Sequence, residues 1–259
     1  MPQEVELSGG NMNKPVLAGG RIYKDVSRAT PNIHALLEHV REKGLAWVPQ
    51  SFGVDAERNK HALSFLPGTV LHDTPDWLWD GDLLATIARH LREWHDATLG
   101  FAPVNGDWLL QTDGGSEVIC HNDFAPYNWV FEGRRFAGLI DFDTCAPGSR
   151  LWDIAYTAYR IVPLMPSGPA EEFGEVSPFS TEKMATRLGL FLKAYASGDE
   201  RLRYPSAEVI VKLQDRLHAL ADWSERFGQQ SGNADILEHA RMYRLHRAWL
   251  GEHKAAFAG

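Results

Sequence analysis

The chain has few cysteines and no long hydrophobic run. Among its 259 residues only Cys120 and Cys145 are cysteines, and they form neither a C-x-x-C motif nor a zinc-ligand spacing. A disulfide scaffold is therefore excluded, and a reducing cytoplasmic compartment is favoured. No apolar stretch approaches the length of a membrane-spanning helix, and the first residues, 1–6, lack the basic and apolar regions of a signal peptide. The sequence predicts a cytoplasmic protein without membrane insertion.

Basic residues are also fewer than acidic ones. Lys and Arg number 26 against 34 Asp and Glu, which gives a net charge of −8. Nucleic-acid phosphates require a basic surface, so a nucleic-acid partner is not expected. An acidic surface is compatible with a cationic ligand, although many soluble proteins are acidic without binding one. The chain has no G-x-x-x-x-G-K-[ST] P-loop and no internal repeat.

One stretch, residues 118–143, concentrates polar residues at the ends of apolar segments. It reads VICHNDFAPYNWVFEGRRFAGLIDFD, in which 118–120, 129–131 and 136–140 are predicted strands. Between them lies the spacing H-x-D-x-x-x-x-N, formed by His121, Asp123 and Asn128, and the last strand runs into Asp141. This order of motif, hairpin and I-D-F is typical of kinase-like catalytic sites.

The residue types suit phosphoryl transfer. A carboxylate has to orient the acceptor hydroxyl and take its proton, and Asp123 is placed for that role. Magnesium prefers hard oxygen ligands, which Asn128 and Asp141 can supply. His121 is expected to brace the loop. The alternative, that His121 and Asp123 only cap a turn, is disfavoured by the motif's context.

The segments HNDFAPYN and GLIDFDTCAPGSRLWDIAY resemble the aminoglycoside phosphotransferase and choline-kinase-like family. Protein kinases have Arg after the motif His and Gly after Asp-Phe, whereas Asn122 and Asp143 stand there in this chain, as in the small-molecule enzymes. The resemblance implies an α+β, two-lobed protein-kinase-like fold. A small β-rich N-lobe would span 1–66 and a larger, mostly helical C-lobe 67–259. It also implies ATP as co-substrate, bound between the lobes, and Mg²⁺ as cofactor.

The resemblance assigns further residues to nucleotide binding. Lys24, at the end of a predicted strand, would contact the α- and β-phosphates, and Glu38 on the helix predicted for 30–44 would pair with it; Glu42 is a competing partner. The expected phosphate-covering loop and the hinge that would bind adenine contain Gly9, Gly10, Asn11, Ser64, Phe65 and Leu66.

The remaining pattern predicts two strands at 47–54 and 61–66 and helices at 76–99, 181–196, 206–227 and 234–257. The connector 163–180 is long and contains Glu171, Glu172 and Glu175, so it is expected to be mobile or to face the substrate. The last helix carries His239, His246 and His253. Their seven-residue spacing, about 10 Å per interval, is too long for one metal ion.

The predicted function is ATP-dependent transfer of a phosphoryl group to a hydroxyl of a small molecule, first of all an aminoglycoside-type acceptor. Asp143 and the connector glutamates would then attract the cationic substrate. Two alternatives stay open: a kinase for another alcohol of the choline, sugar or homoserine type, and a non-catalytic nucleotide-binding immunity or interaction protein. The predicted oxygen ligands and base, Asp123, Asn128 and Asp141, are all present, which disfavours the non-catalytic alternative.

Overall fold

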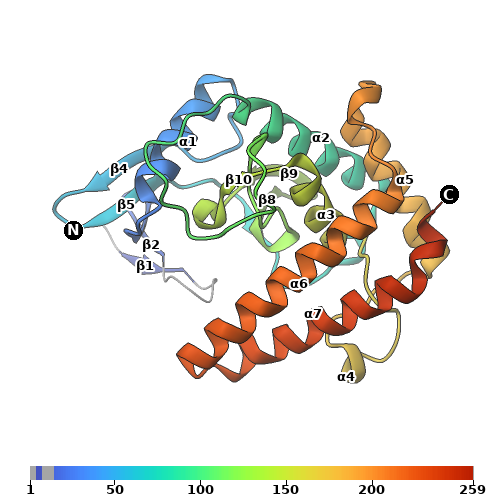
Figure 1. Cartoon of the computed structure of the whole chain (residues 1–259). Coiled ribbons are helices and arrows are strands. Elements are labelled where there is room, and N and C mark those ends of the chain that lie inside the picture. The colour runs from blue at the N-terminus through green and yellow to red at the C-terminus, as the bar shows by residue number, and fades with distance from the viewer. Residues whose placement is uncertain (1–3, 8–14, 259) are drawn as a thin grey trace. The chain divides into compact units, whose positions relative to one another are not determined.

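The computed structural model describes residues 4–7 and 15–258 (Figure 1). The chain forms two compact units. Unit 1 contains Met1–Thr74 and Glu93–Arg150, and unit 2 contains Pro75–Arg92 and Leu151–Gly259. The lobe boundary expected after residue 66 stays a prediction.

The N-terminal part of unit 1 is an antiparallel sheet with one helix, as predicted. Its strand order is β1-β2-β3-β5-β4. The strands are β1 (Val5–Glu6), β2 (Val16–Ala18), β3 (Arg21–Asp25), β4 (Ser51–Asp55) and β5 (Lys60–Ser64). Helix α1 (Thr30–Glu42) has Pro31 in its first turn, where no intrahelical N–H bond is lost. The apolar side chains that α1 buries are Ile33, Leu36, Leu37 and Val40.

The strand predicted from residue 47 begins only at Ser51. The preceding backbone groups bond to other segments: the Trp47 carbonyl accepts from Leu139 N at 3.1 Å, and the Val48 carbonyl accepts from Arg41 Nη1 at 2.8 Å. The Trp47 and Val48 carbonyls therefore bond outside the strand ladder, and of residues 47–50 only Val48 and Pro49 are buried.

The second part of unit 1 consists of short strands and turns. Strand β7 (Val118–Cys120) pairs antiparallel with β10 (Ala146–Gly148), and β6 (Thr69–Val70), β8 (Trp129–Glu132) and β9 (Arg135–Leu139) form a three-stranded antiparallel sheet. Gly68, directly before β6, has φ 138°, and a Cβ there would lie 2.6 Å from the Phe131 carbonyl oxygen. Only glycine fits this close approach without strain.

Helix α2 (Gly81–Thr98) passes from unit 2 into unit 1. The helix predicted for 76–99 is interrupted, because Asp80 is extended at ψ 137° and separates the 3₁₀ turn η1 (Asp76–Trp79) from α2. In unit 1, Trp94 of α2 is fully buried and its indole N–H donates to the Ile119 carbonyl at 2.8 Å. This bond fastens β7 to the helix.

Unit 2 is helical, and its C-terminal helices begin as predicted. Its helices are α3 (Arg150–Ile161), α4 (Ala170–Phe173), α5 (Thr181–Ala196), α6 (Ser206–Ser231) and α7 (Ala234–His253). The first residue of α3, Arg150, still belongs to unit 1. Helices α6 and α7 lie side by side and are joined at Gly232, which ends α6 at φ 67° (Figure 1). None of the helices in the described ranges is long and apolar enough to cross a membrane.

Candidate active site

The H-x-D-x-x-x-x-N loop follows β7 directly. His121 is fully buried and packs edge-on against Phe142 (ring centroids 4.9 Å apart), Phe124 and Trp94. The carbonyl of His121 accepts a hydrogen bond from Thr144 Oγ1 at 2.9 Å. His121 is therefore part of the core beneath the loop, and the bracing role expected for it stays a prediction.

A second loop, which starts where β9 ends, lies against the first. Ile140 N donates to the Asn128 carbonyl at 2.9 Å, and Asn122 Nδ2 donates to the Thr144 carbonyl at 2.8 Å. Together with the Thr144–His121 bond, these contacts tie residues 121–128 to residues 140–144. The two sequence segments that carry the predicted catalytic groups are thus joined by hydrogen bonds within unit 1.

Both loops contain a left-handed residue that is not glycine. Asn122 has φ 66° and Asp141 has φ 64° and ψ 69°. Asn and Asp tolerate this region better than other side chains, but it still costs free energy. Such strain is concentrated at functional sites, where the surrounding contacts enforce it.

Lys24 of β3 meets the second loop. Its Nζ lies 2.6 Å from Asp141 Oδ1 and 2.6 Å from Asp143 Oδ2, and its side chain is only 11% exposed. Burial by itself would lower the pKa of Lys24, but the negative charges of Asp141 and Asp143, and the hydrogen bonds they accept, raise that pKa above its ordinary value. Lys24 is therefore firmly cationic.

The ion pair expected between Lys24 and Glu38 is not formed. Glu38 is mostly exposed and lies 3.6 Å from His34 Nε2, one helical turn away. Within the described ranges, neither Glu38 nor its competitor Glu42 pairs with Lys24, because the two aspartates already satisfy the ammonium group. Asp143, which was expected to attract the acceptor, forms an ion pair with Lys24.

Asp123 is held by two donors from its own motif. Asn128 Nδ2 donates to Asp123 Oδ2 at 2.8 Å and to the Asp123 carbonyl at 2.9 Å. The Tyr127 hydroxyl donates to Asp123 Oδ1 at 2.5 Å. Sequence reasoning overlooked Tyr127. Its position four residues after Asp123, in a turn that Pro126 starts, could have indicated it.

The predicted hinge follows β5. Ser64 N donates to the Gln50 carbonyl at 2.8 Å, and Phe65 N donates to the Gly20 carbonyl at 3.2 Å. No described residue hydrogen-bonds the backbone of Leu66. Of the three hinge residues, Leu66 therefore has the backbone groups best suited to an adenine base. Gly9, Gly10 and Asn11 lie outside the described residues.

A magnesium ion fits the residues present. Asn128 points its amide nitrogen at Asp123, and its Oδ1 accepts no hydrogen bond from any described residue. This oxygen and the Asp141 carboxylate are hard ligands. Within the described ranges no three His, Cys, Asp or Glu residues form a metal-binding group. Mg²⁺ is nevertheless commonly held by one or two protein ligands together with water and substrate phosphates, so the pair suffices.

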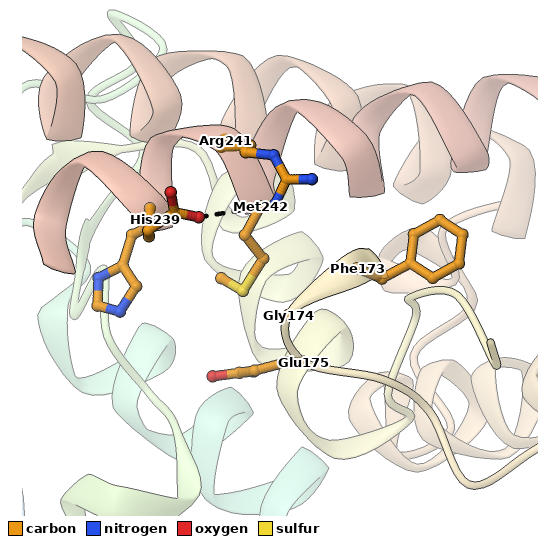
Figure 2. A pocket seen from close by; sticks show the side chains of 7 residues that line it. Phe173, Gly174, Glu175, His239, Arg241 and Met242 are labelled. Atoms are coloured by element: carbon orange, nitrogen blue, oxygen red, sulfur yellow. Dashed lines mark ion pairs between the residues drawn. The ribbon is translucent and has the colours of Figure 1, made fainter. Parts of the chain in front are cut away.

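A cavity of about 220 Å³ lies elsewhere, in unit 2, between the 173–175 segment and helix α7 (Figure 2). Glu175 beside it is paired with Arg160, whose Nη1 lies 2.5 Å from Glu175 Oε2. His239 lines the cavity, whereas His246 is buried and bonded to Tyr159. None of the predicted catalytic residues lines this cavity. The candidate active site is therefore identified by its residue types and their contacts, and not by a cavity.

The chain is similar to known proteins in sequence and in fold. Residues 80–176 match the sequence profile of the family described as "Phosphotransferase enzyme family". The chain is 29% identical over 180 residues to the Trifolitoxin immunity protein of Rhizobium leguminosarum bv. trifolii, an alignment that covers 67% of this chain and 68% of that protein.

Solved structures show the same fold at low sequence identity. An ethanolamine kinase from Plasmodium vivax superposes with a TM-score of 0.67 at 13% identity, covering 95% of this chain and 82% of the other. An aminoglycoside phosphotransferase from Alicyclobacillus acidocaldarius gives a TM-score of 0.54 at 15% identity, covering 99% and 90%. The resemblance and the α+β fold expected from the sequence are confirmed: the chain has a protein-kinase-like fold and carries the sequence pattern of the phosphotransferase enzyme family over residues 80–176.

Proposed function

We propose that the protein is an ATP-dependent O-phosphotransferase that acts on a small hydroxylated molecule. One observation carries the proposal: unit 1 joins Lys24, Asp141 and Asp143 in one ion cluster, and hydrogen bonds tie their loop to the loop of Asp123 and Asn128. A cation for phosphates, a base for a hydroxyl and oxygen ligands for a metal thus lie on segments of unit 1 that ion pairs and hydrogen bonds join. Phosphoryl transfer requires these groups together.

The chain's own residues would act as follows. Lys24 attracts the phosphates through its fixed positive charge, and Leu66 offers backbone groups to the base of the nucleotide. Asp123 accepts a hydrogen bond from the acceptor hydroxyl and so aims its oxygen at the γ-phosphorus. The new O–P bond forms while the bond to the ADP oxygen breaks, and the hydroxyl proton goes to Asp123. When bound by Asn128 and Asp141, Mg²⁺ would neutralise the charge of the phosphates.

We propose an acceptor that carries both a hydroxyl and a cationic nitrogen, with the aminoglycoside type as the first candidate. The net charge of −8 favours cations. Glu171 and Glu172 are exposed and form no ion pair with any described residue, whereas Glu175 and Asp143 are already paired. Ethanolamine and aminoglycosides, named for the two similar structures, share this chemistry. Choline, sugar and homoserine remain the alternative acceptors, and the experiment below includes compounds of these types.

The test is ADP release from Mg-ATP in the presence of a panel of aminoglycosides, amino alcohols and sugars. Wild type should respond to one class, and Asp123→Asn should bind Mg-ATP normally while kcat falls about 10²–10⁴-fold, because Asn can accept a hydrogen bond but cannot take the proton. A variant that retained wild-type kcat would remove Asp123 from the catalytic role.

A second candidate is a nucleotide-binding immunity protein without turnover. The similarity to the Trifolitoxin immunity protein favours it. In that case Mg-ATP would bind, but no acceptor would raise ADP release above that of Asp123→Asn. Protection of cells by Asp123→Asn as well as by wild type would then support immunity by binding, whereas loss of protection would support immunity by phosphorylation.

A further inference from the structure

We infer that Tyr127 is a guard on the catalytic base. Its hydroxyl covers Asp123 until an acceptor displaces it, and it thereby keeps water from using the same carboxylate. The inference rests on the proposed role of Asp123 as the base.

The two oxygens of Asp123 are held differently. Oδ2 is bonded to Asn128, which is 5% exposed and fixed in a turn by the bond from its N to the Ala125 carbonyl at 2.9 Å. Oδ1 is bonded to Tyr127, which is 39% exposed. Exposed side chains change rotamer quickly, whereas buried ones are held by packing. Oδ1 is therefore the oxygen that can be uncovered.

The Tyr127 contact has the same chemistry as the expected acceptor contact. In both, a hydroxyl donates to a carboxylate oxygen, and a hydrogen bond to a charged group is stronger than one between neutral groups. An acceptor that binds through several groups can replace the phenol. A single water molecule, which has no further contacts to hold it, competes less well.

The reaction that the guard suppresses is ATP hydrolysis. In it, a water oxygen forms the new bond to the γ-phosphorus, the bond to the ADP oxygen breaks, and the water proton goes to Asp123. Tyr127→Phe removes the hydroxyl and keeps the ring, so this variant removes the Tyr127 donor from Oδ1 without opening a cavity. The rate of ATP hydrolysis and the affinity for the acceptor should both increase in this variant.

The experiment measures ADP release from Mg-ATP without any acceptor, in wild type, Tyr127→Phe and the double variant Asp123→Asn/Tyr127→Phe. We expect Tyr127→Phe to hydrolyse ATP about 10- to 150-fold faster than wild type, the change that corresponds to losing one hydrogen bond to a charged group. The double variant should lose that gain. Tyr204→Phe, a change in unit 2 on a ring that packs against Tyr195, is the matched control and should leave hydrolysis unchanged.

With an acceptor found in the panel, Tyr127→Phe should lower KM by a similar factor and leave kcat within about twofold. Equal or slower hydrolysis in Tyr127→Phe would overturn the guard; slower hydrolysis would instead mean that the phenol assists Asp123. Because hydrolysis needs no acceptor, these results are independent of the acceptor panel, whose failure would count against the proposed function alone.

Discussion

Lys24 is the residue on which the site depends most. It is 11% exposed and has two carboxylates within 2.6 Å of its ammonium group. A partly buried ammonium group is tolerated only when it is paired. Removal of the Lys24 side chain would leave two neighbouring negative charges without their cation. Removal of one aspartate would leave Lys24 with a single carboxylate partner. These contacts decide which pairs of residues are energetically coupled.

The coupling can be measured with double-mutant cycles on the free energy of unfolding. Lys24→Met with Asp143→Asn should show an interaction energy of about 0.5–3 kcal/mol, because the two side chains touch. Lys24→Met with Glu38→Gln should be additive within about 0.5 kcal/mol, since Glu38 contacts His34 instead. Urea unfolding of the single and double variants gives both numbers. A strong interaction in the Glu38 cycle would restore the pairing first expected from the sequence.

Asp141 is predicted to be the metal-binding partner of Asn128. Asp141→Ala should lower kcat/KM at least about 100-fold, because the electrostatic help of a metal is worth several kcal/mol. The free energy of unfolding should fall by only about 1–2 kcal/mol, the cost of alanine at the left-handed φ of 64°, since Asp141 is 40% exposed and Lys24 keeps Asp143. Wild-type activity should vanish in EDTA and return with Mg²⁺ or Mn²⁺. Full turnover of Asp141→Ala would take this residue out of the site.

At the scale of elements, β4, β5 and α1 are joined by a buried polar chain. Ser51 Oγ lies 2.7 Å from His61 Nε2 and 2.8 Å from His34 Nδ1. Burial, and the neighbouring His34 and Lys24, lower the pKa of His61 to about 4. The sheet therefore holds His61 in its neutral form.

This lowered pKa predicts how stability depends on pH. Unfolded His61 takes up a proton near its ordinary pKa of about 6.5, whereas folded His61 does so only near pH 4. Between these values the unfolded state binds more protons, so the free energy of unfolding rises with pH and falls on acidification. His61→Gln should reduce this slope by up to about 1.4 kcal/mol per pH unit. Urea unfolding from pH 7 to pH 4 measures it, with the exposed His72→Gln as control. An unchanged slope in His61→Gln would contradict the prediction.

At the scale of the whole molecule, the two units have different kinds of core. Unit 1 packs rings around His121, whereas unit 2 joins its helices partly through buried arginine. In unit 2, Arg187 of α5 donates to the Trp79 carbonyl at 2.6 Å and to the Ile161 carbonyl at 2.9 Å. Its guanidinium lies 4.7 Å from the centroid of the Phe179 ring. One side chain thus connects η1, α3 and α5.

Arg187→Met should destabilise unit 2 by about 2–4 kcal/mol, because the buried Ile161 carbonyl and the partly buried Trp79 carbonyl lose a charged donor. Amides of unit 2 should exchange hydrogen faster in this variant, which mass spectrometry can follow segment by segment. Arg201→Met, in the same unit at a side chain that is 89% exposed, should change stability by less than about 0.5 kcal/mol. Equal effects of the two substitutions would show that the buried contacts of Arg187 contribute nothing.

Most of the helices and strands, and the order of the motifs in residues 118–143, follow from the sequence by itself. Apolar periodicity placed α1, α5 and α6, and alternating apolar runs placed β7, β8 and β9, because these signals are local. The order H-x-D-x-x-x-x-N, hairpin, I-D-F also sufficed for the resemblance that the comparisons confirm. Local patterns carried these predictions because neighbouring residues decide the hydrogen bonds of an isolated helix or hairpin.

Only the tertiary structure decided which charged and polar groups meet. Lys24 and Asp141 are 117 residues apart, and an ammonium group has no sequence signal that chooses Asp141 and Asp143 over Glu38. The strand expected from residue 47 begins only at Ser51 for the same reason, since the Trp47 and Val48 carbonyls bond to Leu139 and Arg41. Tyr127 is close to Asp123 in sequence, yet a turn and a side-chain rotamer bring its hydroxyl to the carboxylate. Electrostatic pairing depends on distance in space, and distance in space depends on the packing of the whole unit.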